Sequence, residues 1–396
     1  MKMTSYPDFE REDVAIYPAS QLPDLLSDGL DIVAITSKSA LHDGVSCHQT
    51  GEMVAIVAKK ERADLKVLYA PIDIRQRYGK VYLAGAGAGG CDSLTLRVDG
   101  LLRHAALIIY DDLIDTGMLN GYNAEKVYVG KRKGHHHADQ EAINRMLFMA
   151  ATKKQIVVRL KGGDPFIFGR GGEEMTYLRD RYVDVEVVPG VSAVQSAAAS
   201  AGIPLTLRAV SGGVTLLSAH NALAGAGDRT LVYYMCASRL TELRRTLVDE
   251  GIAPSVPVAL VYKAGFFDEA VTLTTVDLMN LREHDSPLLA IIGRTASLYR
   301  ERPKILYTGD EPSQCLIPGK IVHLSALNHA GKRLRDGDLS LFSAIAFTNP
   351  EMVASLLDLF GPLPSHLVLY AYGSVIAEEL RRQGYSATVM ELDEQE

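Results

Sequence analysis

Short apolar runs alternate with helix-patterned segments between residues 80 and 300. The runs are rich in β-branched residues, as buried strands are, and they cover residues 81–84, 106–110, 156–160, 185–188, 214–217, 231–235, 258–261 and 288–292. Between them, Ile143, Met146, Leu147 and Ala150 recur at the spacing of one helix face. This alternation predicts an α/β fold with mainly parallel strands.

The strand and glycine-loop pattern breaks near Leu207–Gly213 and then restarts. A restart of this kind is typical of a second folding unit, so we expect two α/β lobes, residues 79–209 and residues 210–302.

The two ends of the chain carry weaker patterns. Residues 1–78 contain two strand candidates, 31–35 and 53–58, and one charged helical segment, which is too little for an α/β domain of usual size. Residues 303–396 contain further strand candidates at 305–307, 321–324, 344–347 and 367–370. We therefore expect a two-lobed core with a short α/β segment at each end.

Composition narrows the class of protein. The chain has 396 residues, of which 47% are hydrophobic and 22% charged, so it can bury two or three cores. No leader or membrane-spanning pattern is found, and the expected location is cytoplasmic. The net charge of -7 argues against a nucleic-acid surface. The four cysteines lie far apart, which indicates reduced thiols.

A first glycine loop follows the run at residues 81–84. Gly85, Gly87 and Gly90 match G-x-G-x-x-G, and Asp111 and Asp112 end the next strand, where a ribose-binding acid is expected. Taken alone, the motif favours a dinucleotide-binding fold. The alternative without a binding function is a plain tight turn. A nicotinamide-dependent oxidoreductase is therefore one alternative.

A second glycine loop, residues 160–174, is not typical of nicotinamide-binding sites. Its glycines let a ligand lie against bare backbone amides, and Arg170 and Glu173 share one helix face. A third loop, residues 188–193, places Ser192 where it can cap the next helix. Loops at the carboxyl ends of parallel strands meet at one crevice, so we expect a composite site.

These motifs resemble those of the tetrapyrrole methylases, and among them the uroporphyrinogen III C-methyltransferases. The resemblance rests on VYLAGAGAGGCDSLTLR, VGKRKGHHHADQEAIN, VVRLKGGDPFIFGRGGEE and VVPGVSAVQSAAASAGIPLTLR. It implies two lobes with S-adenosyl-L-methionine in the cleft between them, a homodimer, no metal, and S-adenosyl-L-homocysteine as a product. The implied reaction methylates uroporphyrinogen III at C2 and C7, giving precorrin-2 through precorrin-1, toward sirohaem or cobalamin.

The resemblance also assigns residues to roles. The implied cofactor-binding residues are Gly85, Gly87, Gly162, Gly163, Asp164, Phe168, Ser192, Ala193, Met235, Ala290 and Ile291. The implied catalytic residues are Arg170, Glu173, Asp111 and Arg208. The implied substrate-binding residues are Arg132, Leu113, Arg170 and Arg208. Arginine suits an anionic substrate because its guanidinium stays charged and pairs bidentately with carboxylates.

Some positions depart from the family pattern. The usual GAGPGD loop reads GAGAGG at residues 85–90, and the usual LTHR reads LTLR at residues 205–208, so we expect an altered rate or affinity. His135, His136 and His137 are consecutive and cannot all face one metal ion. Contact with substrate carboxylates is the favoured interpretation. A decayed methylase that serves as a tetrapyrrole-binding scaffold is the non-enzymatic alternative.

The ends resemble neighbouring pathway enzymes in part. GLDIVAITSKSA, within residues 1–78, is similar to a stretch of hydroxymethylbilane synthases, and SAIAFTNPEMVASLLDLF, within residues 303–396, is similar to uroporphyrinogen III synthases. Both segments are shorter than those families. The resemblance implies a degenerate first segment and a truncated second one, neither with independent activity.

Overall fold

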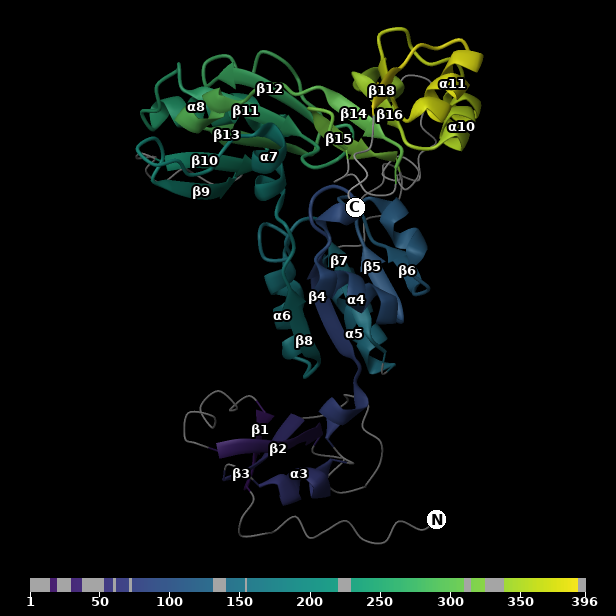
Figure 1. Ribbon diagram of the computed structural model, residues 1–396. Coiled ribbons are helices and arrows are strands. Elements are labelled where there is room, and N and C mark those ends of the chain that lie inside the picture. Colours follow the sequence, from purple (N-terminus) through teal and green to yellow (C-terminus); the bar gives the residue numbers. More distant parts are fainter. Residues whose placement is uncertain are drawn as a thin grey trace.

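The computed structural model contains four β-sheets along one chain (Figure 1). It describes residues 15–19, 30–37, 53–59, 62–70, 73–130, 140–153, 155–219, 229–309, 315–324 and 338–390. The two central sheets form the two lobes, and one smaller unit lies at each end of the chain.

The N-terminal unit is a small antiparallel sheet with one helix. Its strands are β1 (Ala15–Pro18), β2 (Leu30–Ser37) and β3 (Met53–Lys59), in the order β1-β3-β2. Helix α3 (Ala63–Tyr69) buries Leu65 and Tyr69 against Ile56 and its neighbours. Both strands predicted here are confirmed.

The first lobe is a parallel sheet in the order β6-β5-β7-β4-β8. Its strands are β4 (Lys80–Gly85), β5 (Leu107–Tyr110), β6 (Glu125–Tyr128), β7 (Val157–Lys161) and β8 (Asp184–Val188). Helix α4 (Leu96–His104) packs on one face, and α5 (Gln140–Thr152) and α6 (Gly171–Arg179) pack on the other. The predicted apolar face of α5 is confirmed, because Ile143, Leu147 and Ala150 are buried.

The second lobe is a mixed sheet in the order β12-β11-β13-β10-β9. Its strands are β9 (Gly213–Ser218), β10 (Arg229–Tyr234), β11 (Pro257–Tyr262), β12 (Ala270–Thr275) and β13 (Leu288–Ile292). Helix α8 (Leu240–Asp249) covers one face and α7 (Ala193–Ala201) the other. The prediction of mainly parallel strands is wrong for this sheet, since β9 and β10 alone pair in parallel.

Helix α7 precedes the predicted lobe boundary at residues 207–213, yet it packs on the second sheet. Val194, Ala197 and Ala201 share a buried cluster with Val232 of β10 and Ile291 of β13. The loop between β8 and α7 therefore crosses from one sheet to the other.

The C-terminal unit is a parallel sheet in the order β15-β14-β16-β17-β18. Its strands are β14 (Lys304–Tyr307), β15 (Lys320–His323), β16 (Ala344–Phe347), β17 (Val368–Tyr372) and β18 (Thr388–Met390). Helices α10 (Pro350–Phe360) and α11 (Ser374–Arg382) pack on it around a core of its own. This unit lies beside the second lobe (Figure 1).

Short 3-10 helices join several of these elements. They are η2 (Ile74–Arg77), η3 (Cys91–Ser93), η4 (Thr116–Gly121), η5 (Ala237–Arg239), η6 (Arg294–Leu298) and η8 (Asp338–Leu341). Within the part of the chain that the structure describes, no helix combines the length and apolar character needed to cross a membrane.

Candidate functional site

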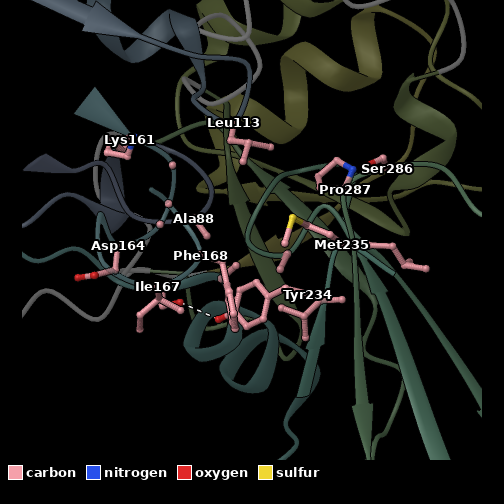
Figure 2. Close-up of a pocket in the computed structure, with 18 of the residues that line it drawn as sticks. Ala88, Leu113, Lys161, Asp164, Ile167, Phe168, Tyr234, Met235, Ser286 and Pro287 are labelled. Atoms are coloured by element: carbon pink, nitrogen blue, oxygen red, sulfur yellow. Dashed lines mark hydrogen bonds between the residues drawn. The ribbon is translucent and has the colours of Figure 1, made fainter. Parts of the chain in front are cut away.

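A cavity of about 250 Å³ opens between the two lobes (Figure 2). Loops that follow β4, β5, β7 and β8 form its first-lobe side, and the ends of β10, β11 and the start of β13 form its second-lobe side. The lining residues are Ala88, Asp111, Leu113, Lys161, Gly162, Gly163, Asp164, Ile167, Phe168, Gly169, Ser192, Ala193, Tyr234, Met235, Val261, Ala264, Phe266, Ser286, Pro287, Leu288 and Leu289. The predicted convergence of three loops on one crevice is confirmed.

Glycines let the three loops touch backbone to backbone. The Gly87 and Gly163 amides donate to each other's carbonyl oxygens, at 3.2 and 2.8 Å. A Cβ on Gly85 would lie 2.5 Å from the Gly163 oxygen, and one on Gly190 would overlap both neighbours. Gly85 and Gly87 thus fasten the first loop to the second and do not line the cavity. Their predicted contact with a cofactor stays a prediction.

Asp164 and Tyr234 tie the third loop in place. One Asp164 oxygen accepts the Phe166 amide at 2.8 Å, and the other accepts the Gly190 amide at 3.1 Å. From the second lobe, the Tyr234 hydroxyl bonds the Ser192 hydroxyl at 2.8 Å (Figure 2). Burial raises the pKa of Tyr234, so this hydroxyl stays neutral.

Two cavity residues hold unfavourable backbone conformations. Phe168 has φ 55° and Met235 has φ 57°, in the left-handed region that residues with a Cβ seldom adopt. Each such residue costs on the order of 1–3 kcal/mol and persists where the surroundings fix it. Both side chains are partly exposed, and the Phe168 ring lies 4.8 Å from the Tyr234 ring. The wall of the cavity therefore includes two strained residues, one from each lobe.

A buried charge network supports Asp111 on that wall. Arg159 donates to Asp111 at 2.9 Å and to Glu174 at 3.2 Å, and Lys161 donates to both Glu174 oxygens at 3.0 and 3.1 Å. Glu174 is fully buried. Burial, and next the charge of Arg159, lower the pKa of Lys161. Two cations thus face two carboxylates, which satisfies charges that a buried site cannot leave unpaired.

Arg159, Lys161 and Glu174 are parts of the site that were not predicted from the sequence. A signal was present, because Arg159 and Lys161 interrupt an otherwise apolar strand, and buried charges require partners. Tyr234, Phe266 and the Ser286–Pro287 pair were also missed. No local motif marks them.

Several predicted residues lie away from the cavity lining. Arg170 and Glu173 form an exposed pair, with nitrogen–oxygen distances of 2.9 and 2.6 Å, and this pairing lowers the pKa of Glu173. A carboxylate with a lowered pKa is a weaker base. Arg208 is exposed at a turn. The roles predicted for these three residues stay predictions.

Ala290 and Ile291 are buried inside β13, whereas Leu288 and Leu289 at its start line the cavity. The cofactor contacts predicted for Ala290 and Ile291 stay predictions. Arg132 and the run His135–His137 lie outside the described residues. The remaining predicted residues, Asp111, Leu113, Gly162, Gly163, Asp164, Phe168, Ser192, Ala193 and Met235, all line the one cavity.

Comparisons with known proteins agree on one family. The model of the tetrapyrrole (corrin/porphyrin) methylases matches residues 80–279. A protein named siroheme synthase 2 from Klebsiella pneumoniae is 37% identical over 245 residues, 59% of this chain and 53% of its own length. Its namesake from Serratia proteamaculans is 38% identical over 255 residues, 61% and 54% of the two chains. This chain thus spans about half the length of these curated relatives.

Among solved structures, a uroporphyrin-III C-methyltransferase from Thermus thermophilus complexed with S-adenosyl homocysteine is 35% identical. The alignment covers 56% of this chain and all of that one, with a TM-score of 0.49.

We predict that Gly190→Ala destabilises the first lobe by about 1–3 kcal/mol, because the new Cβ has no room between Gly85 and Gly163. Hydrogen exchange of the β4 and β8 amides in urea measures the change. Gly100→Ala in α4 is the matched control, since no atom lies within 4 Å of its added Cβ. It should stabilise the lobe by about 0.5–1 kcal/mol. Equal effects of the two variants would contradict the close-packing argument.

We predict that Glu174→Gln lowers the stability of the first lobe by about 3–5 kcal/mol, because two buried cations lose the negative charge that they share. Calorimetry of the unfolding transitions measures it, since a chain with several units need not unfold in one step. Glu141→Gln on α5 breaks an exposed pair with Arg145 and should cost at most about 0.5 kcal/mol. A Glu174→Gln transition no lower than that of the control would mean that the network is not essential.

Proposed function

Because the chain belongs to the tetrapyrrole methylase family, we propose that the cavity binds S-adenosyl-L-methionine and methylates uroporphyrinogen III carried beside it. The observation that carries the proposal is the composite cavity, whose first-lobe wall consists of the family's glycine loops. The products are precorrin-2, formed through precorrin-1, and S-adenosyl-L-homocysteine. The names of the curated relatives support a place in sirohaem synthesis.

The lining residues fit such a donor in chemical character. Phe168, Phe266 and the aliphatic side chains of Val261 and Leu289 offer an apolar surface, which suits an adenine ring. Gly162 and Gly163 line the cavity without side chains, so a ligand can approach the backbone there. The bound donor supplies an electrophilic methyl group. The chain's own contribution is to hold donor and acceptor in line and to keep water out.

Asp111 is the residue that we propose as the proton acceptor after methyl transfer. Asp111 and Asp164 are the carboxylates among the lining residues, and the Asp164 carboxylate joins the second loop to the third by accepting the Phe166 and Gly190 amides. One Asp111 oxygen is fixed by Arg159, and the other accepts the Leu113 amide at 3.3 Å. A positioned carboxylate on the cavity wall is what proton removal from the methylated ring requires.

We also propose the boundaries of the units and the identities of the two terminal segments. The lobes are residues 79–209 and 210–302, residues 1–78 are a degenerate hydroxymethylbilane synthase-like segment, and residues 303–396 are a truncated uroporphyrinogen III synthase-like one. We further propose that Arg132, Arg170 and Arg208 bind substrate carboxylates and that the protein is a homodimer. The oxidoreductase alternative gains no support, because Gly87 of its motif is already bonded to Gly163.

We expect the purified protein to add two methyl groups to uroporphyrinogen III when supplied with methyl-labelled S-adenosyl-L-methionine. Product mass and absorbance measure the transfer. Binding of the tetrapyrrole without any incorporated label would instead support a decayed scaffold. Tight binding of NAD, without binding of S-adenosyl-L-methionine, would support the oxidoreductase.

We predict that Asp111→Asn lowers turnover by about 10²–10⁴-fold, because the amide cannot accept the proton. Equilibrium binding of S-adenosyl-L-homocysteine should change little, since the substitution preserves shape. The control is Asp112→Asn at the adjacent exposed position, where the carboxylate bonds Tyr128. It should retain turnover within a few-fold. Normal turnover of Asp111→Asn would assign proton removal to another group.

A further inference from the structure

The strongest unassigned feature is a buried carboxylate where the second lobe meets the C-terminal unit. Glu269 is the last residue of the loop 263–269, part of which lines the cavity, and its side chain is 3% exposed. One of its oxygens accepts Lys320 of the C-terminal unit at 2.7 Å. The other accepts the Ser200 hydroxyl of α7 at 2.6 Å and the Gly265 amide at 2.7 Å.

The C-terminal unit holds this loop through two further contacts. Lys304 of β14 donates to the backbone oxygens of Glu269 at 2.6 Å and of Phe267 at 3.3 Å. The Phe267 ring packs against the core of the C-terminal unit. The C-terminal unit, which contributes no residue to the cavity lining, therefore holds this loop from outside the cavity.

The other side of the loop closes the cavity. Ala264 and Phe266 line it, and Gly265 lies between them with φ 82°. A Cβ on Gly265 would overlap the Ala88 oxygen, and one on Gly89 would overlap Gly265. The Ala88 oxygen also accepts the Ser196 hydroxyl of α7 at 3.2 Å. A shift of the Gly265 backbone would therefore displace the first glycine loop, which is in direct contact with it.

We propose that Lys320 and Glu269 are positioning residues through which the C-terminal unit sets the affinity of the cavity for the methyl donor. This inference rests on the proposed function. Without Lys320, the buried Glu269 carboxylate keeps two uncharged donors and loses the cation that bonds it directly. Lys304 stays near, but its ammonium donates to backbone oxygens and not to the carboxylate. A buried carboxylate in that state is driven toward water. Its departure releases the Gly265 amide and loosens Ala264 and Phe266 against Ala88.

The test compares Lys320→Met with Lys320→Arg and with Arg382→Gln. The first removes the charge, the second keeps it, and the third removes one positive charge from an exposed pair elsewhere in the C-terminal unit. For Lys320→Met we expect about tenfold faster hydrogen exchange in peptides covering residues 262–270 and about tenfold weaker binding of S-adenosyl-L-homocysteine. At saturating donor kcat should stay within about twofold, because the groups that act on the substrate are untouched.

Lys320→Arg should restore both values to within about threefold of the wild type, and Arg382→Gln should leave both unchanged. Exchange and binding of Lys320→Met equal to those of Arg382→Gln would overturn the proposal. Should Lys320→Met not fold, Lys320→Gln takes its place, with faster exchange at residues 262–270 supporting the proposal and unchanged exchange refuting it. Exchange in the wild-type and variant proteins needs no ligand. A wild type that binds no donor would therefore refute the proposed function, while exchange still decides the coupling.

Discussion

The site depends on the contact of three bare backbones. Gly85, Gly163 and Gly190 lie where three neighbouring strands end, and a Cβ on Gly85 or on Gly190 would overlap the other glycine and the Gly163 oxygen. Gly163 itself has φ 69°, a conformation that favours glycine. This contact allows Asp164 to reach the Gly190 amide and Gly87 to pair with Gly163. Glycine in these loops is therefore needed for the approach of protein to protein, and the ligand cavity is a consequence of that approach.

Much of the fold could be predicted because the central strands are buried on both faces. Such strands read as continuous apolar runs, and the predicted bounds for β7, β11 and β13 differ from the observed ones by at most a residue or two. Strands β6 and β12 were missed because their residues are partly exposed and their polar positions break the run. The order of the second sheet could not be predicted, since β13 inserts between β10 and β11 through contacts remote in sequence.

The candidate site was predictable where its residues lie in contiguous motifs. Gly162, Phe168 and Ser192 belong to loops whose composition is unusual by itself. Tyr234 and Phe266 come from the second lobe, and they reach the cavity only because α7 brings the third loop onto that lobe's sheet. A motif records local backbone needs. A motif does not indicate which side chains from a distant part of the chain will face it across the cavity.

Charge placement separates two carboxylates that look equivalent in sequence. Glu173 pairs with Arg170 at the surface, where both side chains are more than half exposed and water competes for each partner, so such a pair holds its geometry weakly. Asp111 pairs with Arg159, which is 4% exposed and is itself fixed by Glu174 and by the Ile109 and Leu160 carbonyls. A group that removes a proton within one turnover must already be in place when the donor arrives. Among the described residues of the first lobe, the buried network gives that fixed position to Asp111.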